Sequence, residues 1–248
     1  MPELVYPPVI AACKTMFRVL DLKLAVEGAH HVPRTGGVVL ASNHVSYLDF
    51  IFCGLGALDS RRLVRFMAKD AVFRHRVSGP LMRGMRHIPV DRQAGAESYA
   101  AAVRALRAGE AVGVFPEATV SRSLTLRTLK SGTARMARDA DVPVLPVALW
   151  GGQRLWTKGR PRTLSRRHTP ITILVGEPML PGAYPDTAAM TADLAARLGA
   201  MVDRVQREYP DQPAGPEDRW WLPAHLGGTA PTPEQADAID AGRGARNP

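Results

Sequence analysis

The stretch VVLASNHVSYLD, residues 38–49, decides the fold that the sequence predicts. Its apolar start is typical of a strand buried on both faces of a sheet. Polar residues follow from Ser42 onward, at the carboxyl end of that strand, where open α/β sheets place their sites. Ser46 and Asp49 then have the spacing of a capping box, with Ser46 as N-cap. The stretch therefore predicts a buried strand, a polar loop and the start of a helix.

Working outward, similar apolar runs alternate with helical patterns along the chain. The strand-like runs cover residues 37–41, 65–68, 87–90, 111–115, 142–149 and 171–175, and the helical patterns cover 48–58, 96–108, 132–139 and 187–208. Such alternation predicts an α/β fold with a mostly parallel central sheet flanked by helices. Two prolines in the run 142–149 favour an edge strand or an irregular strand there. The apolar side chains of this run could form the wall of a site for an apolar ligand, or they could simply belong to the core.

Three segments are expected. Residues 1–27 contain an amphipathic helix over 9–25, which either packs on its own domain or rests on anionic lipid. Residues 28–209 form the main domain. Residues 210–248, rich in Pro, Gly, Ala and charge, are expected to be a mostly disordered tail. Within this tail, Trp220 and Trp221 either pack back on the domain or lie at a lipid interface.

The charge balance favours anionic partners. The 248 residues include 32 Lys and Arg against 23 Asp and Glu, a net charge of +9. The two cysteines have apolar flanks, which indicates buried thiols in a reducing compartment. The N-terminus lacks the features of a signal peptide, and no apolar stretch reaches the roughly 18 residues of a spanning helix. We therefore expect a protein of the cytoplasm or of the inner membrane surface.

His44 and Asp49 are the candidate catalytic pair. On one continuous helix they would be about 140° apart, so they meet only if His44 stays in the loop before the helix. A histidine held by a carboxylate is a suitable general base near neutral pH. The sequence has no serine or cysteine in a nucleophile elbow, which favours direct attack of a substrate hydroxyl on an acyl carbonyl. Alone, the pair is also compatible with a helix-capping acid and a structural loop histidine.

Further polar residues follow other predicted strands. Lys69 ends one strand, and Asp91 and Arg92 follow the strand at 87–90. A basic residue at such a strand end could reach a phosphate. Alternatively, Asp91 and Arg92 are simply a solvated pair in a turn. Glu117, Thr119 and Arg122 follow the strand at 111–115. They could hold polar substrate groups or belong to a capped loop.

Taken in order, these motifs resemble the PlsC-like glycerolipid acyltransferases, the bacterial 1-acyl-glycerol-3-phosphate acyltransferases included. The ordered set is Asn43-His44-x4-Asp49, Lys69, Ile88-Pro89-Val90-Asp91-Arg92, Phe115-Pro116-Glu117 and Val142-Pro143-Val144-Leu145-Pro146-Val147, within residues 25–180. The resemblance implies that His44 is the base and Asp49 its partner. It implies an acceptor phosphate on Lys69 and Arg92, an acceptor pocket at Glu117 and Thr119, and further substrate contacts at Asn43 and Ala118.

The resemblance also implies the substrates. The acyl donor would be acyl-CoA or acyl carrier protein, the acceptor a lysophospholipid, most simply 1-acyl-glycerol-3-phosphate giving phosphatidic acid. No metal or bound cofactor is expected, and the enzyme would lie peripherally on an anionic membrane at its cytoplasmic face.

One departure leaves the acceptor open. The family's Phe-Pro-Glu-Gly-Thr-Arg-Ser motif here has Ala118 for Gly and Val120 for Arg. Arg122 could replace the missing guanidinium if its loop turns inward. A lyso-aminolipid or glycolipid acceptor is the alternative. A second alternative is a non-catalytic basic protein that binds nucleic acid or membrane, favoured by the Arg-rich residues 160–167, although no nucleic-acid-binding signature is visible and we expect no nucleic acid partner.

Overall fold

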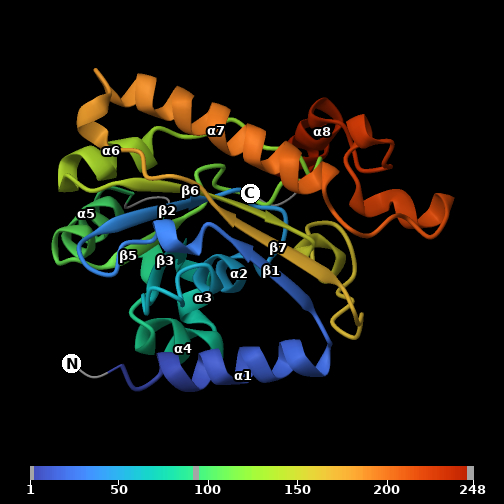
Figure 1. Ribbon diagram of the computed structural model, residues 1–248, viewed down its shortest axis with the longest axis horizontal. Helices are drawn as coiled ribbons and strands as arrows, with labels where there is room; N and C mark the ends of the chain where they lie inside the picture. Colours follow the sequence, from blue (N-terminus) through green and yellow to red (C-terminus); the bar gives the residue numbers. More distant parts are fainter. Residues whose placement is uncertain (1–2, 92–94, 245–248) are drawn as a thin grey trace.

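A seven-stranded sheet forms the centre of the computed structural model, which describes residues 3–91 and 95–244 (Figure 1). The strand order is β1-β7-β6-β2-β5-β3-β4, and each neighbouring pair is parallel except β6 and β7. The strands are β1 (Lys23–Glu27), β2 (Val38–Ser42), β3 (Val64–Lys69), β4 (Ile88–Val90), β5 (Ala111–Val114), β6 (Val144–Trp150) and β7 (Pro170–Val175). The predicted α/β fold with a mostly parallel central sheet is confirmed.

Helices cover both faces of this sheet (Figure 1). One layer holds α5 (Gly95–Arg107), α6 (Gly132–Ala140) and α7 (Thr187–Arg207), and the other holds α1 (Tyr6–Val19), α2 (Asp49–Leu55), α3 (Asp70–Arg74) and α4 (Ser78–Gly84). In β2, Val38 and Leu40 pack into the core under α1 and α2, while Val39 and Ala41 pack into the core under α5–α7. This double burial is why the strand reads as a continuous apolar run.

The N-terminal helix is present but shorter than predicted. It ends at Val19, and residues 23–27, which were placed partly in a helix over 9–25, form the edge strand β1. Asp21 turns the chain with a left-handed backbone (φ 48°), and Leu24 pairs with Ile171 of β7. The exposed edge strand β1 has no long apolar run that would mark it as a strand. Its apolar residues instead continue the helical spacing of α1, which is why the sequence predicted one longer helix. Phe17 buries α1 against the domain, with 3% of its surface exposed.

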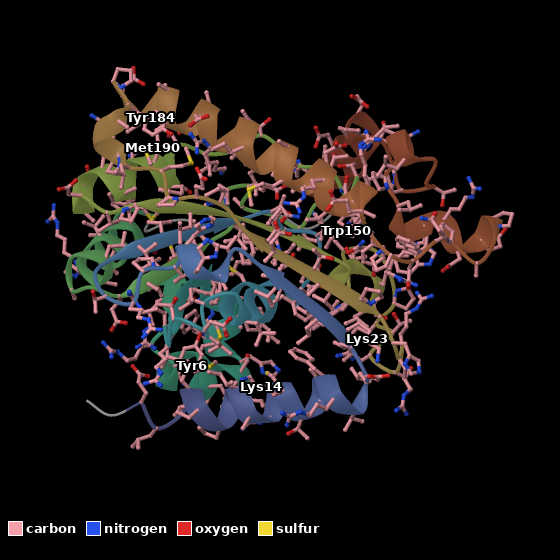
Figure 2. All side chains as sticks on the ribbon, viewed as in Figure 1. Tyr6, Lys14, Lys23, Trp150, Tyr184 and Met190 are labelled. Carbon is pink, nitrogen blue, oxygen red and sulfur yellow. The ribbon has the colours of Figure 1, made fainter. Side chains whose placement is uncertain are left out.

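The run that contains two prolines is an interior strand, which corrects the prediction of an edge or irregular strand. β6 lies between β7 and β2 and is buried along its whole length. Pro146 fits because β7 ends at Val175, and the next residue, Gly176, donates its N–H to the Pro146 carbonyl at 2.8 Å. The hydrogen bonds between β6 and the chain that follows β7 therefore continue at Pro146, although Pro146 has no N–H to donate. Trp150 at the end of β6 lies among the packed side chains of the interior (Figure 2).

The C-terminal residues differ from the expected disordered tail. Two 3-10 segments (Pro216–Trp221 and Ala224–Leu226) and the helix α8 (Pro233–Gly244) pack beside the end of α7 (Figure 1). Trp221 is fully buried, with the Arg154 guanidinium 4.5 Å from its ring centre. The order comes from such distant contacts rather than from local periodicity, which is why composition alone predicted disorder. Of the two alternatives for Trp221, packing on the domain is the one found.

Candidate active site

The predicted motifs meet at one edge of the sheet. β2, β5, β3 and β4 are consecutive parallel neighbours, so the loops that follow them emerge side by side. His44 follows β2 and Glu117 follows β5, while Lys69 ends β3 opposite Val90, the last residue of β4. Arg92 lies outside the described residues. Topology thus gathers motifs that are up to about 70 residues apart in the sequence.

His44 and Asp49 form a hydrogen-bonded pair. Nδ1 of His44 lies 3.0 Å from Oδ2 of Asp49, with His44 in the loop and Asp49 at the first position of α2. The His44 side chain is 18% exposed and the Asp49 side chain 1%. The His44 ring stacks on Phe115, with 4.0 Å between ring centres, so its orientation is fixed from a second side. The pair has the geometry of a base oriented by a buried acid.

Asp49 also shapes the loop that carries His44. Its Oδ2 accepts the backbone N–H groups of Val45 and Ser46, each at 2.7 Å. This is one half of the predicted capping box, but the other half differs because Ser46 Oγ accepts the N–H of Leu48 and donates to the Trp156 carbonyl. Burial raises the pKa of Asp49, while His44 and these N–H groups favour its ionised form.

Asn43 is bound into the protein on both sides of its amide. Its Oδ1 accepts the Leu149 N–H at 2.7 Å, and its Nδ2 donates to the Leu149 carbonyl at 3.0 Å. Asn43 is 1% exposed. Although the resemblance implied a substrate contact, its polar atoms are already paired with β6, and this pairing holds the start of the His44 loop.

Glu117 likewise binds backbone. Its Oε1 accepts the His44 N–H at 2.7 Å, and its Oε2 accepts the Arg127 N–H at 2.9 Å. Burial raises the pKa of Glu117 to about 8, against the opposing effect of these two N–H groups. The carboxyl group of Glu117 thus joins the loops that follow β2 and β5, and an acceptor pocket at this residue stays a prediction.

The altered motif residues have distinct environments. Ala118 is exposed and has a left-handed backbone (φ 58°), a conformation that glycine adopts without strain. Val120 is 5% exposed and packs inward, so this position supplies an apolar contact. Thr119 is half-buried, and its Oγ1 accepts a hydrogen bond from Lys158 Nζ at 3.1 Å.

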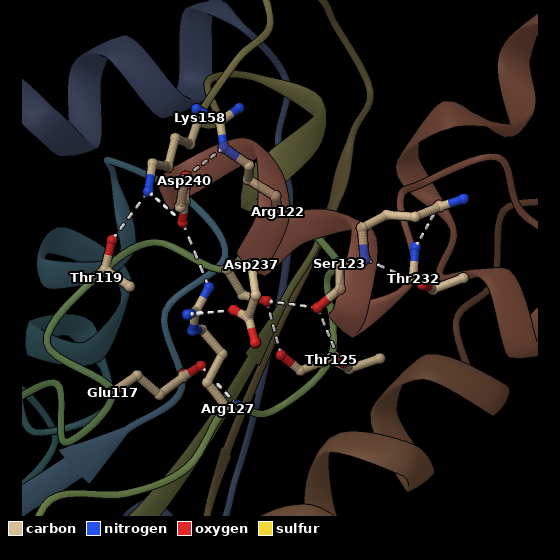
Figure 3. Close-up of polar contacts among 12 residues, drawn as sticks. Glu117, Thr119, Arg122, Ser123, Thr125, Arg127, Lys158, Thr232, Asp237 and Asp240 are labelled. Atoms are coloured by element: carbon tan, nitrogen blue, oxygen red, sulfur yellow. Dashed lines mark hydrogen bonds and ion pairs between the residues drawn. The ribbon is translucent and has the colours of Figure 1, made fainter. Parts of the chain in front are cut away.

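Arg122 contacts the C-terminal helix. Its Nε lies 2.7 Å from Oδ1 of Asp240 in α8, and Lys158 Nζ lies 2.8 Å from Oδ2 of the same carboxylate (Figure 3). Arg127 and Lys158 also contact Asp240, and neither was among the residues predicted for the site. A signal existed for Lys158, which stands just before the Arg-rich residues 160–167, but Arg127 had none. Within the described ranges, no three His, Cys, Asp or Glu residues cluster as a metal site would require.

Comparisons with known proteins place the chain in a family. The acyltransferase family matches residues 23–150 of the chain. The 1-acyl-sn-glycerol-3-phosphate acyltransferase of Bacillus subtilis (strain 168) is 27% identical over 201 residues, which cover 76% of this chain and 94% of that protein. The enzyme of the same description from Neisseria gonorrhoeae is 31% identical over 144 residues, covering 57% of this chain and about half, 54%, of that protein.

A solved structure shares the fold. The crystal structure of the 1-acyl-sn-glycerophosphate (LPA) acyltransferase PlsC from Thermotoga maritima superposes with a TM-score of 0.70 at 20% identity, covering 83% of this chain and 81% of that one. Together with the family match over more than half of the chain, the parallel sheet and the ordered motifs lead to one conclusion. The chain is an enzyme of the acyltransferase family, with the fold of its PlsC-like members.

Proposed function

We propose that this protein transfers a fatty acyl group from a thioester to the free hydroxyl of 1-acyl-glycerol-3-phosphate, which gives phosphatidic acid. The observation that carries the proposal is the His44–Asp49 pair, 3.0 Å between Nδ1 and Oδ2, at the carboxyl end of β2. With Nδ1–H directed at Asp49, the other ring nitrogen, Nε2, is the basic one. The relatives' names support this acceptor, and the geometry of the pair supports His44 as the base.

The reaction needs one base and no covalent enzyme intermediate. Nε2 of His44 takes the proton of the acceptor hydroxyl as its oxygen attacks the thioester carbonyl. The C–O ester bond forms, the C–S bond breaks, and the proton passes from His44 to the departing thiolate. Buried Asp49 stabilises the imidazolium in between. Acyl-CoA and acyl carrier protein both fit this scheme as donors.

An apolar pocket of about 210 Å³ is our candidate for the acyl chain. Its lining comes from α1, α2 and α4 and includes Val9, Cys13, Phe50, Gly54, Leu55 and Leu81. Phe50 contacts Phe66, whose ring stacks with Phe115, the ring that also stacks on His44. A continuous series of aromatic contacts therefore links the pocket to the proposed base.

The same side of the molecule is our candidate for membrane contact. Leu81 lines the pocket and is 41% exposed, and Val77, just before α4, is 68% exposed. Exposed apolar side chains beside a lipid pocket suit an enzyme whose substrates reside in a bilayer. Helices long and apolar enough to cross a bilayer are absent from residues 3–91 and 95–244.

An assay of thiol release tests the function. The purified chain is given acyl-CoA and either lysophosphatidic acid, a lyso-aminolipid or a lyso-glycolipid, and the acylated product is identified. We expect lysophosphatidic acid to be acylated and His44→Ala to reduce kcat by about 10²–10⁴-fold with an unchanged melting temperature. Full activity of folded His44→Ala would refute the proposed base. Preference for an acceptor without phosphate would refute the proposed acceptor.

A further inference from the structure

Three basic residues, Arg122, Arg127 and Lys158, belong to segments that are hydrogen-bonded to the loop that carries His44 or share a partner with it. Ser121, next to Arg122, donates its N–H to the His44 carbonyl at 2.7 Å. Thr157, next to Lys158, donates its hydroxyl to the Val45 carbonyl at 2.6 Å. The third cation belongs to Arg127, whose N–H shares the Glu117 carboxyl with the N–H of His44.

Arg122, Arg127 and Lys158, here called the basic cluster, converge on one carboxylate. Asp240 Oδ1 lies 2.7 Å from Arg122 Nε, and Asp240 Oδ2 lies 2.8 Å from Lys158 Nζ and 3.4 Å from Arg127 Nη1 (Figure 3). Two oxygens of one group thus receive three cations from two loops, one that holds Arg122 and Arg127 and one that holds Lys158. This is the arrangement by which proteins bind a phosphate, here occupied by a carboxylate.

Room for a larger group adjoins the cluster. A pocket of about 350 Å³ is lined by Arg122, Lys158 and Arg160 on one side and by Trp220, Pro231 and Ile239 of the C-terminal segment on the other. The pocket lies between the main domain and the segment that carries Asp240. A ligand in the pocket lies beside Arg122 and Lys158 and competes with Asp240 for the atoms that hold the carboxylate.

We propose that Arg122, Arg127 and Lys158 form a binding site for a phosphate monoester, and that Asp240 of α8 occupies it as an internal competitor until the ligand displaces the helix. The inference rests on the proposed function in that the expected ligand is the acceptor headgroup. The proposal also moves the phosphate contact away from position 120, where the family motif has arginine and this chain has the inward-packed Val120.

The charges support the exchange. Hydrogen bonds from Lys158 and Arg122, opposed by partial burial, lower the pKa of Asp240, so it is ionised near neutral pH. A phosphate monoester carries about −1.5 to −2 charges at that pH and three acceptor oxygens, so it can satisfy the same three cations more fully. Asp237, 66% exposed, pairs with Arg127 at 2.7 Å and would be released together with Asp240.

The test measures binding directly in the full chain. Dissociation constants for glycerol 3-phosphate and for inorganic phosphate are determined by calorimetry for the wild type and for Asp240→Asn. We expect the variant to bind about 3- to 10-fold more tightly, because removal of the competitor raises the fraction of open sites. Glu234→Gln is the matched control, since it changes the same charge on α8 and Glu234 bonds to Thr232, away from the cluster.

The gain must also depend on the cations. Adding Lys158→Ala to Asp240→Asn should abolish the tighter binding. Equal or weaker binding by folded Asp240→Asn would overturn the proposal and make α8 a structural strap. The gain should be similar for both ligands, because it reports the fraction of open sites. Tighter binding of glycerol 3-phosphate than of inorganic phosphate by Asp240→Asn supports a monoester headgroup as the ligand, and equal or weaker binding would overturn that assignment.

A measurement on the wild type covers the case in which Asp240→Asn fails to fold. Amide hydrogen exchange in α8 should become faster when glycerol 3-phosphate is added, because the ligand displaces the helix. Unchanged or slower exchange at saturation would overturn the proposal. None of these readouts involves acyl transfer. A failure of lysophosphatidic acid as acceptor would therefore refute the proposed function and leave the binding result to decide the site.

Discussion

The backbone N–H of His44 donates a 2.7 Å hydrogen bond to Oε1 of Glu117, so the loop after β2 is fixed by the loop after β5. This bond connects two sequence motifs 73 residues apart. Its partner bond, from the Arg127 N–H to Oε2, extends the connection to the basic cluster. Glu117 is therefore a positioning residue, and its effect on chemistry acts through the place of His44.

Glu117 should make stability depend on pH. Burial raises its pKa from 4.5 to about 8, so the folded state holds this proton more tightly than the unfolded state. Its contribution to stability is full below about pH 4.5 and declines as pH rises toward 8. Glu117→Gln cannot titrate, and loses one acceptor at a cost of about 1–3 kcal/mol. Urea unfolding should show the wild-type advantage over Glu117→Gln shrinking from pH 5 to pH 8, and a constant difference would contradict the assignment.

Asp49→Asn should separate charge from geometry. Oδ2 of Asp49 accepts bonds from His44, Val45 and Ser46, and an asparagine oxygen can occupy the same place. The imidazolium then loses its counter-ion, and kcat should fall by about 10²–10⁴-fold with a small change in KM. Steady-state thiol release measures both constants. A decrease of less than threefold would show that the carboxylate charge is dispensable.

Ala118→Gly should stabilise the protein. Ala118 has φ 58°, where the presence of a Cβ costs about 1 kcal/mol, so glycine relieves this strain. Part of the relief is lost because glycine has more conformational freedom in the unfolded chain. We expect a net gain of about 0.5 kcal/mol in thermal or urea unfolding. Ala196→Gly is the matched control on the exposed face of α7, where the same change should cost about 1 kcal/mol. Destabilisation at both positions would contradict the strain at Ala118.

Gly54→Leu should shorten the preferred acyl chain. Gly54 lines the apolar pocket from α2, and a Cβ there would meet only Phe66 among nearby groups, at an ordinary 3.7 Å. The added side chain has space to enter the pocket and reduce its length. Competition between acyl-CoA donors of different lengths should show a shift toward shorter chains. Gly199→Leu in α7, also with room for a Cβ, is the control that should leave the preference unchanged.

Local features of the fold and site were accessible from the sequence. The buried strand, the loop and the helix start lie within residues 38–49, and this local order is enough to predict that His44 and Asp49 can meet. The left-handed backbone at Ala118 falls where the related motif has a glycine. Edge strand β1 escaped notice because its residues are exposed and extend the helical stripe of α1.

Distant contacts could not be predicted in this way. Arg122 and Asp240 are 118 residues apart, and nothing in the composition of residues 210–248 indicates that they would meet. The roles of Asn43 and Glu117 also depend on distant backbone groups, at Leu149 in strand β6 and at Arg127 in the loop after β5. Patterns of side chains do not encode such partners, since any residue with a free N–H could serve.

Burial of Trp221 tethers α8 to the domain. The helix starts only a short segment after this fixed point, so its carboxylates remain close to the cluster even when the helix detaches. A tether of this kind gives an effective concentration of about millimolar. Occupation of the site by Asp240 is thus a unimolecular equilibrium, which dilution of the enzyme does not alter. Only a ligand presented at high local density, as headgroups are within a bilayer, competes well with it.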